Sequence, residues 1–371
     1  MLRLLLTFTF FAAIASCAPL SSSRSSDKLV LKKTTFREIA GWEGDNHSEA
    51  LTVFLKSCNA FATQSDTAII GQGKLSAPAV VWESACRKGQ LVPEGNEALA
   101  REFFETSFIP MHATNNDNSA GLLTGYYEPV IKGARRQQPP FVYPIYALPP
   151  AGTPSYTRSQ IDHGSLGAQA TIIAYTDDPV QLFFLHIQGS GSIQLESGET
   201  LHIGYAGTNG QPYVAIGHVL VNKGIFKKQE ITMPLLRQWL YDNPDQMWPT
   251  MWENTSYIFF RELKGKATIG AQKVPLTADR SLAVDAYYIP LGMPVFLDAL
   301  LPDTPSSPMA IQRKLFVAQD TGSAIRGPTR GDIFFGTGLA AEQLAGRMKA
   351  GGDWTLLVPR ALAITILKTS Q

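Results

Sequence analysis

The first third of the chain has an apolar pattern of helical spacing. After Asn46, apolar residues recur three or four positions apart, at Leu51, Phe54, Leu55, Cys58 and Phe61. This spacing predicts a helix with Asp45 or Asn46 as its N-cap. We expect a second helix over residues 79–87 and a third that begins near Asn96 and is stopped by Pro110.

The pattern changes at Gly121 to short runs of β-branched and aromatic residues between glycine, proline and polar turns. Such runs are typical of strands. Residues 192–203 predict a hairpin that turns at Ser197 and Gly198. Further strands are expected over 122–127, 141–146, 170–175, 180–188, 257–260, 283–285, 295–297, 315–318, 333–335 and 356–358.

Few helices are expected after Gly121. The pattern predicts one over 214–220, one that Thr232 caps and Asn243 stops, and one over 340–349. Strands outnumber these helices and do not alternate with them regularly. The expected fold class is therefore mainly β with a small barrel and peripheral helices, and a parallel α/β sheet is not favoured.

Length and charge narrow the class of protein. The chain has 371 residues, enough for two domains, with 44% hydrophobic and 17% charged residues, as in ordinary folded proteins. Its formal net charge is +1, which gives no electrostatic reason to bind nucleic acid.

The first residues indicate export. Arg3 precedes a short apolar run over 4–14, and small residues lead to Cys17, so residues 1–16 are typical of a secretory signal. The end of this run resembles a bacterial lipobox, which implies lipid attachment to Cys17; the alternative is an ordinary signal with an incidental cysteine. Residues 17–27 predict a Ser-rich tether. Because Ala18 is not an aspartate retention signal, we expect a lipid anchor at the periplasmic face of the outer membrane; the alternative is the inner membrane.

Two further cysteines, Cys58 and Cys86, lie in segments with helical patterning. In an oxidising compartment they can form a disulfide. Burial as two separate thiols is an equal alternative, because the sequence does not fix their separation.

Three aspartates occur where apolar runs meet turns. Asp320 ends one run and Asp332 opens the next, and the connection between them contains three glycines and one proline; Asp285 ends a third run upstream. Glycines beside such acids let a ligand approach the backbone, so these residues predict an acid-lined cleft. The alternative is that each Asp only shapes a turn.

The segments around these acids, AVD ending at Asp285, AQDTGSAIRG around Asp320 and GDIFFG around Asp332, resemble the 3D domain of the membrane-bound lytic murein transglycosylase A family. Upstream segments match the same family in the same order: TGYYEP, HIQGSG, GYAGTNGQPY and YIFFR, beginning at Thr124, His186, Gly204 and Tyr257.

The resemblance implies a double-psi β-barrel made from residues 28–127 and 257–371. It also implies a second small β-domain, residues 128–256, inserted to form the other wall of a groove.

By the same resemblance, the chain cleaves the β-1,4 bond between N-acetylmuramic acid and N-acetylglucosamine in peptidoglycan and leaves a 1,6-anhydro sugar. Asp332 matches the acid/base of the family, and Asp320 and Asp285 match its other two aspartates, as supports. Here Thr329, Arg330 and Gly331 precede Asp332, where some relatives carry a histidine and an aromatic residue. The alternatives are a hydrolase that uses Asp320 and Asp332 with water, and an expansin-like cell-wall binder without catalysis.

The matched motifs also supply candidates for sugar binding, because aromatic faces, hydroxyls and amides suit pyranose rings. Peptidoglycan strands are the expected partner, with cell-wall synthesis or division proteins as further possibilities. No metal or cofactor is expected: metal-binding, serine-hydrolase and phosphate-loop motifs are missing, and too little chain follows the dinucleotide-like segment 336–341 to complete a nucleotide-binding sheet. The sugar-binding candidates are Thr124, Tyr126, Gln188, Ser190, Tyr205 and Asn209.

Overall fold

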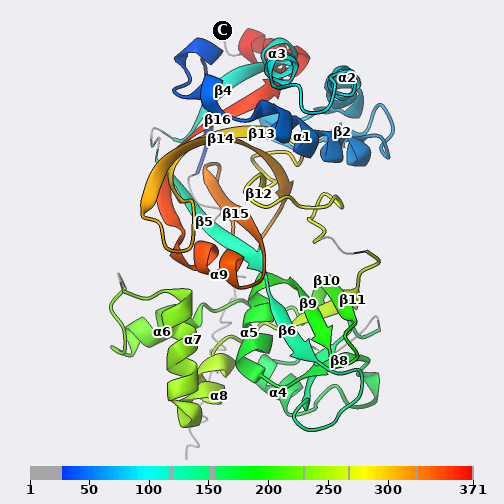
Figure 1. The fold of residues 1–371 in the computed structure, drawn as a ribbon, viewed down its shortest axis with the longest axis vertical. Helices are drawn as coiled ribbons and strands as arrows, with labels where there is room; N and C mark the ends of the chain where they lie inside the picture. The colour runs from blue at the N-terminus through cyan, green and yellow to red at the C-terminus, as the bar shows by residue number, and fades with distance from the viewer. Residues whose placement is uncertain are drawn as a thin grey trace, which may run out of the picture.

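The structure is a computed structural model. It describes residues 27–116, 118, 120–150, 155–228, 230–265, 268–322 and 324–369. The expected signal segment and Cys17 lie outside these residues. The described chain forms two β-rich lobes, with the larger sheet in the upper lobe of Figure 1 and the smaller one below it. The prediction of a mainly β fold is confirmed.

The upper lobe contains an eight-stranded sheet in the order β1-β4-β16-β13-β14-β12-β15-β5. Because β5 also pairs with β16, six of these strands close into a barrel, to which β4 and β1 add at one side. The strands are β1 (Leu29–Lys33), β4 (Phe108–Asn115), β5 (Gly121–Glu128), β12 (Ser281–Val284), β13 (Pro294–Pro302), β14 (Met309–Asp320), β15 (Arg330–Thr337) and β16 (Lys349–Pro359).

The barrel strands are longer than their apolar patterns indicate. The expected strand 315–318 is the fully buried end of β14, whose first half continues as a more exposed hairpin with β13. Apolar runs therefore identify the part of each strand that faces the core, and hydrogen bonding extends the strand beyond it.

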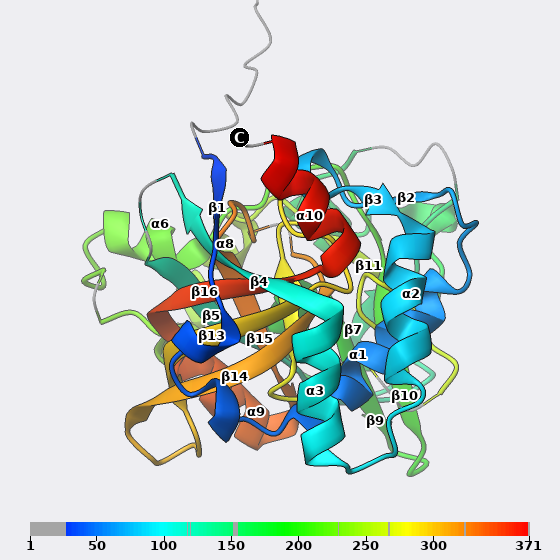
Figure 2. The ribbon, with the colours of Figure 1, turned by 90° about the horizontal axis from the view of Figure 1, so that it is seen from above.

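Helices cover one end of the barrel, as Figure 2 shows from above. As expected, Asn46 and Asn96 cap the first and third helices: their side chains accept hydrogen bonds from the backbone N–H groups of Glu49 and Leu99. The prediction that Pro110 stops the third helix is wrong, because that helix ends at Ser107 and Pro110 lies within β4. The helices are α1 (His47–Phe61), α2 (Ala79–Gly89), α3 (Glu97–Ser107) and α10 (Arg360–Thr369), with the short strands β2 (Ile69–Ile70) and β3 (Ala77–Pro78).

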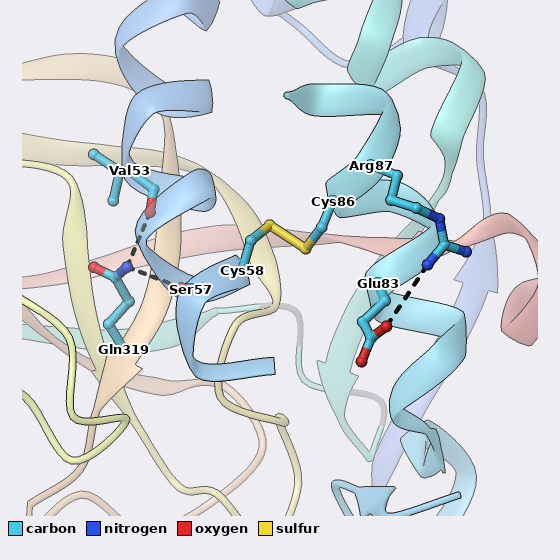
Figure 3. Close-up of a disulfide and its surroundings, with 7 residues drawn as sticks. All are labelled: Val53, Ser57, Cys58, Glu83, Cys86, Arg87 and Gln319. Atoms are coloured by element: carbon cyan, nitrogen blue, oxygen red, sulfur yellow. Dashed lines mark hydrogen bonds and ion pairs between the residues drawn. A yellow bond between two sulfur atoms is a disulfide. The ribbon is translucent and has the colours of Figure 1, made fainter. Parts of the chain in front are cut away.

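A disulfide joins two of these helices. Cys58 on α1 and Cys86 on α2 are bonded, with their Cα atoms 5.6 Å apart (Figure 3). On the other side of α1, the Gln319 side chain donates to the Val53 carbonyl and the Ser57 hydroxyl. The residue before Asp320 is thereby tied to the disulfide-linked helix pair.

The lower lobe contains a four-stranded sheet in the order β11-β10-β9-β6 and a two-stranded β7-β8 pair. The expected hairpin is confirmed, with Gly198 at its turn in the left-handed region (φ 84°). The strands are β6 (Val130–Gly133), β7 (Tyr143–Tyr146), β8 (Ile172–Thr176), β9 (Ser190–Leu195), β10 (Thr200–Thr208) and β11 (Ile258–Glu262). Since β11 belongs to this sheet, we propose that the inserted domain extends to Glu262, beyond the expected end at 256.

One expected strand of this lobe is wrong. Residues 180–188 form most of the helix α5, which Asp178 caps by accepting from the N–H groups of Val180 and Gln181, with Pro179 in the first turn. The apolar run is buried on several sides, so it lacks helical periodicity, and the Asp-Pro start was the available signal.

A second helix begins where the sequence indicated only a stop, because Asn243-Pro244 opens α8 directly after α7. The helices are α4 (Arg158–Asp162), α5 (Pro179–Gln188), α6 (Ile216–Asn222), α7 (Met233–Asp242) and α8 (Pro244–Trp252) in the lower lobe, and α9 (Gly338–Arg347) at the lower end of the barrel (Figure 1). No helix among the described residues is long and apolar enough to cross a membrane.

Candidate active site

The three aspartates come from three adjacent barrel strands. Asp320 ends β14, Asp332 lies in β15, and β12 runs between these strands. Ala283 of β12 is the register partner of both acids. Asp285 follows two residues later, directly after β12. The parallel and antiparallel pairings of one short strand thus bring residues from three parts of the sequence to one end of the barrel.

Two linked hydrogen bonds hold Asp332, and they begin at Arg330 on the same strand. Thr124 of β5, the register partner of Asp332, donates its hydroxyl to Asp332 Oδ1 at 2.6 Å. Arg330 donates through Nη2 to Thr124 Oγ1 at 2.8 Å and through Nη1 to the Gly331 carbonyl. Because Arg330 occupies a lone pair of the Thr124 oxygen, the threonine hydrogen is directed at Asp332. Oδ1 of Asp332 is thereby fixed as an acceptor, and its other oxygen is left to carry a proton.

The environment favours the protonated form of Asp332. Burial raises the pKa of Asp332 to about 6, and the charge of Asp320 acts in the same direction, against the hydrogen bond from Thr124 and the charge of Arg330. The side chain nevertheless keeps some exposed surface. A carboxyl group of this kind can give a proton near neutral pH and take one back.

Asp320 is held more tightly than Asp332. Its Oδ2 accepts from the Tyr126 hydroxyl at 2.8 Å, and its Oδ1 accepts from the N–H groups of Ala271 at 2.8 Å and Thr321 at 2.9 Å. Burial raises the pKa of Asp320 in spite of these three donors. Burial and the two nearby carboxylates also raise the pKa of Tyr126 well above its usual range, so this phenol remains a donor.

Asp285 has a different environment. Its Oδ1 accepts from the N–H of Tyr287 at 3.1 Å, and its Oδ2 accepts from the N–H of Gly327 at 2.9 Å. Gly327 has φ of 108°, in the region that favours glycine. Asp285 therefore fastens the β14–β15 loop. Among the described residues, no hydrogen bond joins it to Asp320 or Asp332.

The structure does not bring all the expected sugar-binding residues to these acids. Thr124 and Tyr126 contact them directly, as described. Gln188, at the end of α5, accepts from the N–H of Tyr127 at 3.3 Å, so it lies at the junction of the lobes. Ser190 opens β9, and Tyr205 is 51% exposed on β10.

Asn209 has an internal role. It is 7% exposed and donates to the carbonyls of Tyr156 at 2.6 Å and Thr255 at 2.8 Å, while its oxygen accepts from the N–H of Tyr257 at 2.8 Å. Its amide is fully used by the backbone, so it organises the loop after β10.

Glu128 also belongs to this region, although the sequence analysis assigned it no role. It ends β5, is 3% exposed, and accepts from the hydroxyls of Ser192 at 3.0 Å, Thr268 at 2.6 Å and Thr337 at 2.8 Å. These partners come from both lobes. The sequence contained a signal for this role: Glu128 is the one charged residue of the TGYYEP motif, whose other residues are typical of a strand and a turn.

Arg330 is the second residue of this kind. The sequence analysis noted Arg330 only because some relatives carry other residues before the matching aspartate. The pairing of β15 with β5 shows that its side chain contacts Thr124. Within the described ranges, no group of three or more His, Cys, Asp or Glu side chains can hold a metal ion.

The barrel is closed, a second β-lobe lies next to it, and its strand ends carry a carboxyl group whose pKa is raised to about 6. This arrangement is that of a barrel enzyme suited to acid-base chemistry. Two family models match the chain: the MltA specific insert domain over residues 122–261 and the 3D domain over residues 280–358. The chain belongs to the membrane-bound lytic murein transglycosylase A (MltA) family.

Several relatives carry that name. The Vibrio cholerae membrane-bound lytic murein transglycosylase A is 30% identical over 239 residues, which cover 63% of this chain and 65% of that protein. The Escherichia coli protein is 34% identical over 226 residues, 60% of this chain and 61% of that protein. The aligned segment thus spans slightly less than two thirds of these relatives.

Solved structures match over more of the chain. A membrane-bound lytic murein transglycosylase from Agrobacterium tumefaciens has a TM-score of 0.81 and 32% identity, and covers 91% of this chain and 99% of its own. Escherichia coli MltA with bound chitohexaose has a TM-score of 0.67 and 26% identity, and covers 89% of this chain and 92% of its own. The double-psi barrel that the resemblance implies is consistent with this fold.

Proposed function

We propose that this protein is a lytic transglycosylase that cleaves the β-1,4 bond between N-acetylmuramic acid and N-acetylglucosamine in peptidoglycan and forms 1,6-anhydromuramic acid. The observation that carries the proposal is the state of Asp332, a partly accessible carboxyl group whose pKa is raised to about 6. Family membership and the chitohexaose bound to the Escherichia coli relative support a glycan as substrate.

In the proposed mechanism Asp332 acts twice. It first donates its proton to the glycosidic oxygen as the bond to the anomeric carbon breaks and oxocarbenium-like charge develops. The ionised Asp332 then accepts the proton of the sugar's 6-hydroxyl while that oxygen bonds to the anomeric carbon. The carboxyl group ends in its starting state, and no water is consumed.

The neighbours of Asp332 have supporting roles in this scheme. Thr124, whose hydroxyl Arg330 orients, holds Oδ1, which leaves the other oxygen for proton transfer to the substrate. Asp320 contributes a negative charge that favours protonation of Asp332. We infer that Asp285 is a positioning residue for the loop, that Tyr126, Gln188, Ser190 and Tyr205 remain candidates for sugar contact, and that Asn209 is not one.

A two-acid hydrolase is less well supported, because three donors already use most of the acceptor positions of Asp320. Digestion of purified sacculi by the protein distinguishes the transglycosylase, the hydrolase and the non-catalytic binder. After digestion, mass analysis should find anhydro-muropeptides, and borohydride should leave their sugar ends unchanged. Reducible ends would indicate hydrolysis, and sacculus binding without soluble products would indicate an expansin-like binder.

We propose further that lipid on Cys17 anchors the protein to the periplasmic face of the outer membrane. The membrane-bound names of the relatives support membrane association. Labelled palmitate should be incorporated into the wild type and not into Cys17→Ala. Equal labelling of both proteins would contradict the anchor.

A further inference from the structure

The outer face of the barrel carries a lysine beside the acid site. On β5, Thr124 is the register partner of Asp332 on one side and of Lys349, the first residue of β16, on the other. The Thr124 hydroxyl bonds to Asp332, so these two side chains share a face. Register partners project from the same side of a sheet, so Lys349 belongs to that face too. Burial agrees, because the preceding residues on β5 and β16, Leu123 and Met348, lie in the core, whereas Lys349 is exposed.

The separation of Asp332 and Lys349 suits one sugar ring. Neighbouring strands lie about 4.8 Å apart, so two such steps separate the two Cα atoms by about 10 Å. The flexible four-carbon stem of lysine lets its ammonium group turn toward a ligand at the acid. A substituted sugar that touches Asp332 at one edge can therefore meet Lys349 at the other.

Lys349 has no partner among the described residues. Arg330, which lies on the same face, already donates to Thr124 and to a backbone carbonyl. In the part of the chain that the structure describes, Lys349 forms no ion pair and no side-chain hydrogen bond. The charges that act on Asp332 are those of Arg330 and Asp320. Lys349 is thus placed to bind an anionic group of a ligand and not to tune the acid.

An open apolar surface lies beside Lys349. Leu122, two residues before Thr124 on β5, is 43% exposed, and its register partner on β16 is Gly351. Gly351 is exposed, and a Cβ atom there would meet only the Gly121 carbonyl oxygen, at 3.6 Å. Residues two positions apart on a strand share a face, so an apolar side chain and a cation stand together beside this glycine.

We propose that Lys349 and Leu122 recognise the lactyl substituent of N-acetylmuramic acid, with its carboxyl group at Lys349 and its methyl group on Leu122. This inference rests on the proposed function, which takes muramic acid as the reacting sugar. The substituent is attached two carbons from the anomeric carbon, so it lies within one ring width of the bond that Asp332 protonates. N-acetylglucosamine has only a hydroxyl at that carbon, so Lys349 is a specificity-determining residue for muramic acid.

The test measures binding of peptide-free glycan strands to the protein with Asp332→Asn, which prevents cleavage. The strands carry either free lactyl carboxylates or carboxylates converted to neutral methylamides. At low salt the charged strands should bind about fivefold more tightly, as expected of an exposed ion pair, and high salt should reduce the difference. Addition of Lys349→Ala should remove the difference. The matched change Lys33→Ala, at an exposed lysine on β1, should retain it.

Gly351→Val tests the apolar contact. Valine suits a strand, and its side chain would fill the open surface beside Leu122. In the Asp332→Asn protein this change should weaken binding of the muramic acid strands about tenfold. Binding of a chitooligosaccharide, which has no lactyl group, should stay the same and shows that the fold is intact. Unchanged binding of muramic acid strands would remove Leu122 from the site.

The outcome is separable from that of the proposed function. Equal binding of charged and neutralised strands, or a difference that survives Lys349→Ala, would overturn the lactyl site. Release of anhydro products by wild type together with such a result would overturn the lactyl site alone. Binding that depends on the lactyl charge and on Lys349, without release of anhydro products by wild type, would overturn the proposed function alone.

Discussion

At the residue scale, the raised pKa of Asp332 sets the expected pH dependence. The first step needs the protonated acid, so kcat/KM should fall as the pH rises through about 6. A pH profile on soluble glycan strands measures this limb. Full activity that persists to pH 9 would show that a different group supplies the proton.

The same shift makes a prediction about stability. The pKa of Asp332 in the folded protein, about 6, lies above the usual aspartate pKa of 3.8, so the native state favours the protonated acid. This contribution to stability is lost as the pH rises through 6. Relative to wild type, Asp332→Asn should therefore gain up to about 3 kcal/mol of unfolding free energy between pH 4 and pH 8. Urea unfolding at both pH values measures the change, and a difference that does not vary with pH would contradict the buried acid.

Arg330 provides a test of positioning. Its charge lowers the pKa of Asp332, and its guanidinium directs the Thr124 hydroxyl. Arg330→Ala should reduce kcat about tenfold or more and move the basic limb to higher pH. Arg330→Lys should reduce kcat while leaving the limb nearer its wild-type position. The exposed Arg87→Ala on α2 is the control; an unmoved limb in Arg330→Ala would indicate a merely structural role.

At the element scale, the disulfide between α1 and α2 supports the layer behind the acid site. Its cysteines are 28 residues apart, and a loop of that size corresponds to about 3 to 4 kcal/mol of stabilisation. The double variant Cys58→Ala/Cys86→Ala should lose roughly that amount in urea unfolding. Reductant should destabilise wild type and leave the variant unchanged; equal effects on both would show that the bond does not form.

The helices show which elements the hydrophobic pattern of the sequence can predict. Helices with a side-chain cap, such as those beginning after Asn46 and Asn96, were predictable because the cap and the apolar spacing agree. α5 was not, because its apolar residues face the core on several sides and mimic a buried strand. Whether Cys58 and Cys86 pair depends on the packing of α1 on α2, which patterning does not contain.

At the scale of the whole molecule, the site depends on contacts far apart in sequence. The motifs identified Asp285, Asp320 and Asp332 through their resemblance to a family, yet only the strand order places β12 between the other two acids. The chain from Arg330 through Thr124 joins residues 206 positions apart. Local pattern therefore supplied the candidates, and long-range pairing assigned their partners.

Glu128 joins the two lobes. Its two oxygens accept from three hydroxyls on both sides of the junction. Glu128→Ala should raise KM for glycan strands and lower the unfolding free energy by about 3 kcal/mol, because buried hydroxyls lose their acceptor. Glu128→Gln should lose less. Wild-type KM and stability in Glu128→Ala would remove this residue from the account.

The central claim is that one carboxyl group performs both proton transfers. The most direct measurement is the release of anhydro-muropeptides from sacculi by Asp332→Asn, quantified by mass analysis beside wild type and Asp285→Asn. We expect release by Asp332→Asn to fall at least a thousandfold with the fold intact, while Asp285→Asn retains measurable turnover. Near-normal release by Asp332→Asn would contradict the account.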